Sequence, residues 1–164
     1  MRKFAPFAVL FLSLAPVVQA AAVRDVKEPA AIQKMFAPAA KLRLVNVWAT
    51  WCAPCVEEMP ILRTIHTTFG TDVSMVGVSL DDMVPGEPGD TRARVVKFVE
   101  SKHVPYPNAY YVGSPDALAD TMKIDGAIPV TIIYDSKGRE LWRRQGSLDQ
   151  SQIMDKIREL LKAR

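Results

Sequence analysis

Cys52 and Cys55 are the two cysteines of this 164-residue chain, and they stand together in the stretch LVNVWATWCAPCVEEMP, residues 44–60. An apolar run, residues 44–48, leads directly into them. A disulfide between residues this close closes a loop too short to constrain much of the unfolded chain, so a purely structural bridge is a weak explanation. The pair is more typical of a dithiol that does chemistry, with metal binding by two thiolates as the main alternative.

Redox chemistry requires that the two sulfurs differ. If a helix begins at Cys52, both side chains rise on one face of that helix within bonding range. Cys52 then lies at the positive end of the helix dipole, beside unpaired backbone N–H groups, and both effects favour its thiolate. The thiolate is the species that attacks a disulfide. We therefore predict Cys52 as the attacking cysteine, and Cys55, one turn deeper and less exposed, as the cysteine that resolves the mixed disulfide.

The residues around the first cysteine fit a substrate-binding role. Pro54 restricts the backbone in the first helical turn without losing a needed N–H donor. Ala53 is small enough to let the backbone of a partner approach, and Trp51 offers an aromatic platform beside the sulfur. Burial in the core for Trp51 and ordinary helix-start chemistry for Pro54 are the alternatives.

The proposed chemistry requires a strand that leads up to the cysteines and a helix that begins at Cys52. Residues 41–50 change from alternation to a continuous apolar run, which indicates a buried central strand. From Cys52 onward apolar residues recur at three- and four-residue spacing until Gly70, which indicates a helix. The valine-rich residues 72–80 indicate a second buried strand, and this order predicts a parallel pair joined by a helix.

The second half of the mature chain adds antiparallel strands. Its predicted elements are a loop over 81–91, an amphipathic helix over 92–103, an extended segment over 104–113, a short Ser-capped helix over 114–124, a hairpin formed by PVTIIYD and ELWRRQG, and a closing helix over 147–164. The fold class is therefore α/β, with a mixed central sheet flanked by helices on both faces.

The motifs carry a family resemblance. WATWCAPC after an apolar strand resembles the thioredoxin superfamily, and the longer LVNVWATWCAPCVEEMP is similar to its exported TlpA/ResA/CcmG-like thiol:disulfide oxidoreductases. GAIPVTIIYDSKGRELWRRQG, residues 126–146, resembles the cis-proline strand and hairpin of that family. The resemblance implies a thioredoxin-like fold over residues 41–164. Residues 81–125 then form an insertion between the βαβ half and the C-terminal ββα half.

The resemblance also implies a role for Ile128 and Pro129. Their peptide bond is expected to be cis and to pack opposite the cysteines, so that the backbone of Ile128 faces an incoming substrate peptide. Cis bonds are essentially a proline feature. The residues alone show only a proline at the head of a strand, a position that is also allowed for ordinary reasons.

Two positions bear on proton transfer. Thioredoxin itself has a buried acid in the strand before the cysteines, and the matching position here is Asn46, which cannot carry a proton. The TlpA/ResA-like proteins instead have a glutamate three residues past the second cysteine, which corresponds to Glu58. We expect Glu58 to help Cys55 lose its proton, directly or through water. The alternative is a solvated Glu58 near the positive end of the helix, and Glu57 is expected on the surface.

The ends of the chain and its charge set broad limits. Residues 1–20 combine a basic start, a short apolar core and a small-x-small exit, which predicts a signal peptide cleaved after Ala20, favoured over an uncleaved membrane anchor. Residues 21–40 are interpreted as a lead-in to the domain, with an irregular tail over 21–30. Without Arg2 and Lys3 the chain has 19 basic and 18 acidic residues, which gives no footprint for nucleic acid.

The predicted function is that of a monomeric thiol:disulfide oxidoreductase that is periplasmic or otherwise exported and needs no cofactor. The resemblance implies a reductant of client protein disulfides, such as those of apocytochrome c or of copper-site proteins, kept reduced by a membrane thiol donor. A dithiol oxidant or isomerase and a non-catalytic binding module remain open.

A copper(I) metallochaperone that uses the same cysteines is the other hypothesis that remains open. Met59 would add a thioether to the two thiolates. His66 lies eleven residues past Cys55, which is about 16 Å along a helix and out of reach, and His103 has no assigned place. We therefore predict no metal site, with Met59 in the core.

Overall fold

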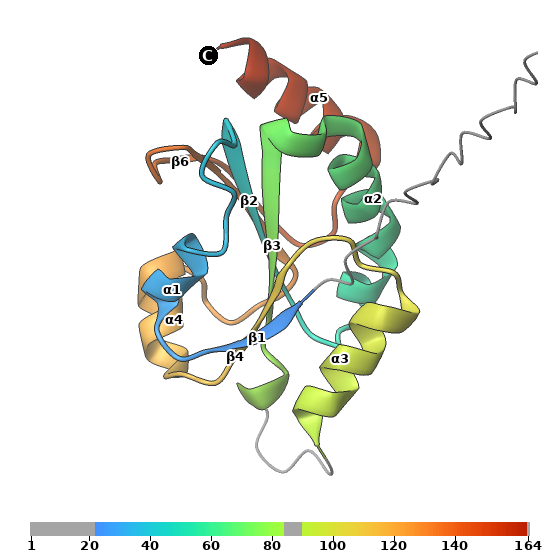
Figure 1. Ribbon diagram of the computed structural model, residues 1–164, viewed down its shortest axis with the longest axis vertical. Helices are drawn as coiled ribbons and strands as arrows, with labels where there is room; N and C mark the ends of the chain where they lie inside the picture. The colour runs from blue at the N-terminus through green and yellow to red at the C-terminus, as the bar shows by residue number, and fades with distance from the viewer. Residues whose placement is uncertain (1–21, 84–89, 164) are drawn as a thin grey trace, which may run out of the picture.

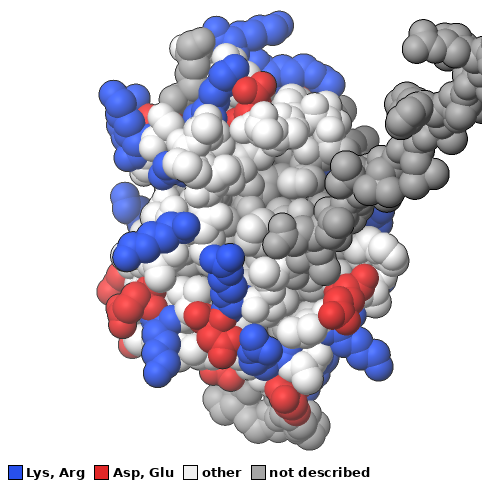
Figure 2. All heavy atoms as spheres, in the orientation of Figure 1, with Lys and Arg blue, Asp and Glu red and all other residues white. Residues whose placement is uncertain are grey.

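The structure is a computed structural model and describes residues 22–83 and 90–163. The predicted signal peptide over residues 1–20 lies outside the described residues, as does most of the loop predicted over 81–91. Within the described ranges, no helix combines the length and the apolar character needed to cross a bilayer. Figure 2 shows basic and acidic side chains interspersed on the face that it presents.

The strands form one mixed sheet with the order β1-β4-β3-β2-β5-β6 (Figure 1). They are β1 (Val23–Val26), β2 (Leu42–Trp48), β3 (Val73–Ser79), β4 (Asn108–Tyr111), β5 (Val130–Asp135) and β6 (Glu140–Gln145). β1, β4, β3 and β2 pair in parallel, whereas β5 and β6 run antiparallel to their neighbours. β2 and β3 are apolar and almost wholly buried because helices cover both faces of the sheet.

Helices cover the two faces of the sheet (Figure 1). They are α1 (Pro29–Gln33), α2 (Ala53–Phe69), α3 (Thr91–Ser101), α4 (Pro115–Met122) and α5 (Gln150–Lys162), with short 3-10 helices η1 (Gly70–Asp72) and η2 (Asp81–Met83). Apolar residues of α2, α3 and α5 share one core, and those of α1 and α4 share the core on the opposite face. The α/β class, the mixed sheet and the coverage of both faces are confirmed.

The start of the domain corrects one expectation. Residues 21–30 were expected to form an irregular tail, which is wrong for the described part, because residues 23–26 are β1. This strand pairs in parallel with β4, and Val26 is buried in the core shared with α1 and α4. Four residues are too few to show a periodicity that would reveal a strand, and the pairing partner lies more than eighty residues away.

The sheet brings two distant segments to one edge. β2 ends at Trp48, four residues before Cys52, and β5 begins at Val130, directly after Pro129. Because β2 and β5 are antiparallel, the end of one lies beside the start of the other, and Val47 is the register partner of Val130. The Ile128-Pro129 peptide therefore lies beside the start of α2.

Candidate active site

The two cysteines form a disulfide at the N-terminus of α2, with an S–S distance of 2.10 Å. Cys52 is the N-cap of this helix, and the backbone N–H of Cys55 donates to its sulfur at 3.3 Å. Cys52 is 6% exposed and Cys55 is fully buried. The helix start at the first cysteine and the deeper position of the second are both as predicted, so the geometry favours attack on a partner by Cys52.

Side chains predicted to bind substrate surround Cys52 on the surface. Trp51 is 47% exposed, so its alternative as a core residue is wrong. Ala53 and Pro54 are exposed at the first two positions of α2. These three exposed residues therefore form the surface around Cys52, which is itself only 6% exposed.

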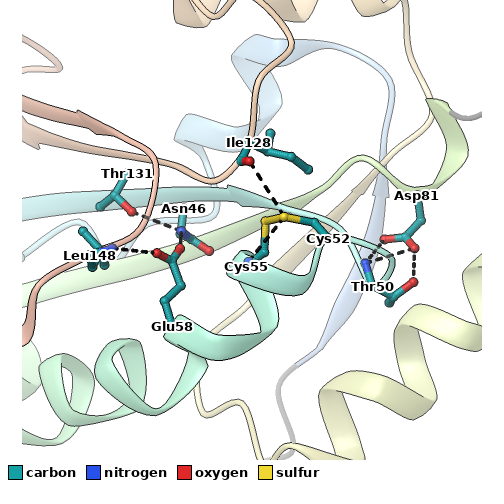
Figure 3. The surroundings of a disulfide bond; sticks show 9 residues. All are labelled: Asn46, Thr50, Cys52, Cys55, Glu58, Asp81, Ile128, Thr131 and Leu148. Carbon is teal, nitrogen blue, oxygen red and sulfur yellow. Dashed lines mark hydrogen bonds between the residues drawn. A yellow bond between two sulfur atoms is a disulfide. The ribbon is translucent and has the colours of Figure 1, made fainter.

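The Ile128-Pro129 peptide bond is cis, as the resemblance implied. The carbonyl oxygen of Ile128 lies 3.8 Å from the sulfur of Cys52, and Figure 3 shows it directed at that sulfur. Pro129 is buried, and its carbonyl oxygen accepts from the backbone N–H of Gly146 at the end of the hairpin. The backbone before Pro129 is therefore held against the attacking sulfur.

Glu58 is buried on the sheet side of α2, only 2% exposed, so the alternative of a solvated glutamate is wrong. Asn46 Nδ2 donates to Glu58 Oε1 at 2.7 Å, and the backbone N–H of Leu148 donates to Oε2 at 3.2 Å. Burial raises the pKa of Glu58 to about 7, although both hydrogen bonds act to lower it. A carboxyl group with a pKa near neutrality can both accept and release a proton at neutral pH.

Asn46 connects this carboxyl to the sheet beneath the disulfide. It is fully buried in β2, and its Nδ2 also donates to Thr131 Oγ1 on β5 at 3.1 Å. Figure 3 shows Glu58, Asn46 and Thr131 as one polar group beside Cys55. The sequence singled out Asn46 and Glu58 one by one, and the fold brings them into contact.

Comparison with known proteins places this geometry in a family. The model of the redoxin family matches residues 19–158. The chain belongs to the redoxin family. The resemblance to the thioredoxin superfamily is confirmed.

Relatives of this redoxin carry thiol–disulfide names. HelX of Rhodobacter capsulatus, a "thiol:disulfide interchange protein", is 31% identical over 124 residues, which cover 74% of this chain and 61% of HelX. DsbE of Xylella fastidiosa strain Temecula1 has the same description and is 27% identical over 72% of this chain and 54% of its own length. ResA of Geobacillus thermodenitrificans, a "thiol-disulfide oxidoreductase", is 26% identical over 58% of this chain and 49% of its own length. The redoxin thus spans 49–61% of the length of these relatives.

Solved structures agree on the fold of this redoxin. A thioredoxin-related protein from Neisseria meningitidis serogroup B superposes with a TM-score of 0.60 at 27% identity, over 75% of this chain and 87% of the other. A thiol-disulfide isomerase from Corynebacterium glutamicum superposes with a TM-score of 0.63 at 19% identity, over 74% and 81%. The thioredoxin-like fold predicted from the sequence is therefore confirmed.

Asp81 is a site residue of the redoxin that the sequence reasoning missed. It is fully buried after the end of β3 and accepts hydrogen bonds from the backbone N–H of Thr50 at 3.2 and 3.1 Å, from the Thr50 hydroxyl, and from the Ser79 hydroxyl at 2.7 Å. It therefore holds the loop that carries the cysteines (Figure 3). The signal was present, because an acid that directly follows a buried parallel strand lies at the edge where ligands and active sites gather.

The surroundings of the cysteines do not support the hypothesis of a copper(I)-binding protein. Met59 is 2% exposed, in the core as expected, and its sulfur accepts from the Tyr106 hydroxyl at 3.8 Å. Among the described residues, no three His, Cys, Asp or Glu side chains gather in a way that would hold a metal ion. His66 lies in the last turn of α2, at the opposite end from the cysteines.

Proposed function

We propose that the protein is an exported thiol:disulfide oxidoreductase that reduces disulfides in client proteins through Cys52 and Cys55. The observation that carries the proposal is the disulfide at the start of α2, whose outer sulfur faces the Ile128 carbonyl oxygen at 3.8 Å. This arrangement places a reactive sulfur beside a backbone edge on which an extended peptide can pair. The descriptions of HelX, DsbE and ResA support the same chemistry.

The first step begins from the dithiol. The Cys52 thiolate, stabilised by the helix dipole and by the N–H of Cys55, attacks one sulfur of the client disulfide. The client S–S bond breaks, a mixed disulfide to Cys52 forms, and one client sulfur leaves as a thiolate. Cys52 keeps 6% exposure whereas Cys55 is fully buried, so Cys52 is the more accessible sulfur and is the attacking group.

The second step releases the client. Cys55 loses its proton to Glu58 and attacks the Cys52 sulfur, so that the mixed disulfide breaks and the Cys52–Cys55 disulfide forms. The second client sulfur leaves as a thiolate and takes up a proton, and two electrons have passed to the client. A thiol reductant in the membrane then reduces the Cys52–Cys55 disulfide and completes the cycle.

Glu58 suits the second step for two physical reasons. Its burial on the sheet side of α2 places it one turn beyond Cys55 and away from bulk water. Its pKa, raised to about 7 by burial, lets it take a proton from a thiol and later release it at neutral pH. Proton transfer to Glu58 lowers the barrier for attack because the thiolate is far more nucleophilic than the thiol.

The segment of the client protein that carries its disulfide is proposed to lie between two parts of the surface around Cys52, here called rims. Trp51, Ala53 and Pro54 form one rim, and the backbone of Ile128 before Pro129 forms the other. An extended peptide that pairs with the Ile128 backbone brings its own cysteine over the Cys52 sulfur. Such pairing uses main-chain hydrogen bonds and tolerates many sequences.

The proposed setting is the periplasm, with the signal peptide cleaved after Ala20 and the protein acting as a monomer. The proposed clients are the haem-binding cysteines of apocytochrome c or the cysteines of copper-site proteins. The named relatives are described as interchange proteins and oxidoreductases, and the choice between the two client classes is decided by the trapping experiment below.

Trapping in the native host tests the function. Cys55→Ala leaves Cys52 able to attack but removes the resolving thiol, so client proteins should remain disulfide-bonded to Cys52 on a non-reducing gel. Cys52→Ala is the matched control and should trap none. A purified wild-type protein that fails to accelerate insulin reduction by dithiothreitol, together with an empty trap, would contradict the proposed function.

The direction of electron flow has its own test. A reductant should have a reduction potential near that of thioredoxin, about −270 mV, because Ala53-Pro54 lacks the histidine that stabilises the thiolate in the strong oxidant DsbA. Equilibration with glutathione buffers, followed by quantification of both redox forms, measures this potential. A reduction potential of about −120 mV, typical of DsbA, would identify the protein as an oxidant.

A further inference from the structure

Asn46 makes an unusual set of hydrogen bonds beside the disulfide. Its Nδ2 donates to Glu58 Oε1 and to Thr131 Oγ1, at 2.7 and 3.1 Å. Its Oδ1 is buried and accepts no hydrogen bond from the described residues. Figure 3 shows this oxygen on the side of the amide turned toward Cys55. A buried acceptor without a donor costs free energy, so the arrangement calls for a physical reason.

The neighbours of this amide can each change between donor and acceptor. An ionised Glu58 only accepts, whereas a protonated Glu58 also donates. The Thr131 hydroxyl does either, and Cys55 donates as a thiol but accepts as a thiolate. The amide of Asn46 has nearly the same shape after half a turn about its terminal torsion, which exchanges its donor and acceptor.

Two arrangements therefore satisfy the amide. With Glu58 ionised and Cys55 a thiol, Nδ2 donates to Glu58 and Thr131, and Oδ1 accepts from the thiol. With Glu58 protonated and Cys55 a thiolate, Oδ1 accepts from Glu58 and Thr131, and Nδ2 donates to the thiolate. The two differ by one proton, moved from sulfur to carboxyl, and by half a turn of the amide.

We propose that the Asn46 amide rotates by half a turn when the proton passes from Cys55 to Glu58, and so stabilises the Cys55 thiolate that attacks the mixed disulfide. The inference rests on the proposed function. The S–H bond of Cys55 breaks, an O–H bond forms on Glu58, and no electrons are transferred in this step. Asn46 and Thr131 act as positioning residues through Glu58 and Cys55.

The contacts of Glu58 direct its proton toward Asn46. Oε2 accepts from the backbone N–H of Leu148, which is fixed, whereas Oε1 accepts from the Asn46 amide, which can rotate. Oε1 is therefore the oxygen whose partner can adapt to a proton. A proton on Oε1 would oppose Nδ2 with a second donor, and this conflict disappears when the amide turns its oxygen to Glu58. The rotation therefore follows from the protonation and needs no other conformational change.

The other groups around Glu58 leave this coupling undisturbed. Tyr106, in the segment before β4, has its pKa raised by burial and by the charge of Glu58, so its phenol stays neutral. β5 contributes the uncharged Thr131, and the segment before α5 contributes the backbone of Leu148. On α2 itself, Glu57 is exposed. Among these neighbours, Glu58 is thus the group whose pKa of about 7 lets its charge change at neutral pH.

Nuclear Overhauser effects from the Asn46 side-chain NH₂ test the rotation directly. The full chain with Cys52→Ser, which leaves Cys55 as a free thiol, is titrated from about pH 5 to about pH 9. Below the midpoint of Glu58, near pH 7, the NH₂ protons should contact the Cys55 β-protons, and above it the Thr131 methyl. The added substitution Glu58→Gln should abolish the pH dependence. Contacts to Thr131 at every pH would overturn the inference.

The rate of Cys55 alkylation gives an independent readout, because a rotating Asn46 amide and one that stays on Glu58 predict opposite changes when Asn46 is removed. In the Cys52→Ser chain, Asn46→Leu should slow alkylation at neutral pH about three- to tenfold, the effect of losing one hydrogen bond to the thiolate. If the Asn46 amide instead keeps donating to Glu58, the substitution has the opposite effect. Loss of that hydrogen bond would keep Glu58 protonated to higher pH and reduce the repulsion between its carboxylate and the Cys55 thiolate. Alkylation would then be unchanged or faster, which would overturn the inference.

The control is Asn108→Leu, which removes a buried amide on β4 and should leave the alkylation rate of Cys55 unchanged. The outcomes also separate this inference from the proposed function. If the wild-type protein reduces insulin disulfides and the contacts of Asn46 do not switch, the rotation is wrong and the reductase assignment remains.

Discussion

Glu58 lies beneath the cysteine pair because its helix turns it toward the sheet rather than toward water. It is one turn beyond Cys55, and the hydrogen bonds from Asn46 and Leu148 only partly offset the loss of hydration. An ionisable group kept in such surroundings destabilises the fold when it is charged. The burial that suits Glu58 for proton transfer therefore also lowers the stability of the fold when Glu58 is charged.

This effect of burial predicts a pH dependence of stability. The pKa of Glu58 rises from 4.5 to about 7 on folding, so the folded state holds a proton that the unfolded state has lost between these values. The contribution of Glu58 is fully present below about pH 4.5 and is lost as the pH rises through about 7. Glu58→Gln should therefore stabilise the disulfide form by roughly 3 kcal/mol more at pH 8 than at pH 4.5.

Urea unfolding of the disulfide form at several pH values measures this difference. Glu57→Gln is the matched control, since this neighbour is exposed on the same helix and should change the pH dependence little. Equal pH profiles for wild type and Glu58→Gln would show that Glu58 titrates in the folded protein as it does in water.

At the scale of elements, the site depends on how the ends of three strands meet. β2 delivers the cysteines, β5 begins directly after Pro129, and β3 ends just before Asp81. Asp81 then binds the backbone and hydroxyl of Thr50, two residues before Cys52. The loop between β2 and α2 is thereby fixed by a residue from the neighbouring strand, which keeps the helix start aligned with the sheet.

Removal of this anchor should cost both stability and alignment. Asp81→Ala leaves the Thr50 N–H and the hydroxyls of Thr50 and Ser79 without their acceptor, which we expect to lower the free energy of unfolding by about 2–4 kcal/mol. Insulin reduction per folded molecule should also fall. Asp82→Ala is the matched control, because Asp82 is exposed and accepts from the Tyr110 hydroxyl at 2.8 Å rather than from the loop before Cys52. Equal losses for the two variants would rule out the anchoring role.

At the scale of the whole molecule, one sheet separates two cores with different tasks. The core of α2, α3 and α5 contains the cysteines, whereas the core of α1 and α4 completes the opposite face. Val26 of β1 packs in the second core and Val23 packs against the first, and among the described strands β1 pairs with β4, at the far edge from β6. The active site and β1 are thus at separate places in the sheet.

This separation predicts that β1 can be removed with a loss of stability and little loss of chemistry. Relative to a chain that begins at Ala22, a chain that begins at Glu28 loses the burial of Val26, the ladder to β4 and the ion pair of Asp25 with Arg92. We expect the free energy of unfolding to fall by about 2–4 kcal/mol. Urea unfolding and insulin reduction at low temperature measure the two effects. A lost activity in a chain that still folds would show that β1 supports the site.

The sequence by itself determined the chemistry of the cysteine pair and the class of the fold. Helix and strand periodicity, the helix start at Cys52 and the helix end at Gly70 are local patterns, set by neighbours within a few residues. The motif around Pro129 also identified the cis peptide, through resemblance. These features are readable because the physical interactions that produce them act over short distances along the chain.

Only the tertiary structure decided what surrounds that pair. Asn46 meets Thr131 across 85 positions, Leu148 reaches Glu58 across 90, and Asp81 binds Thr50 across 31. Burial of Glu58 depends on the packing of α2 against the sheet, so its raised pKa is not a local property. β1 likewise exists because β4 offers it an edge. Contacts between distant segments depend on the whole fold, and no short pattern in the chain encodes them.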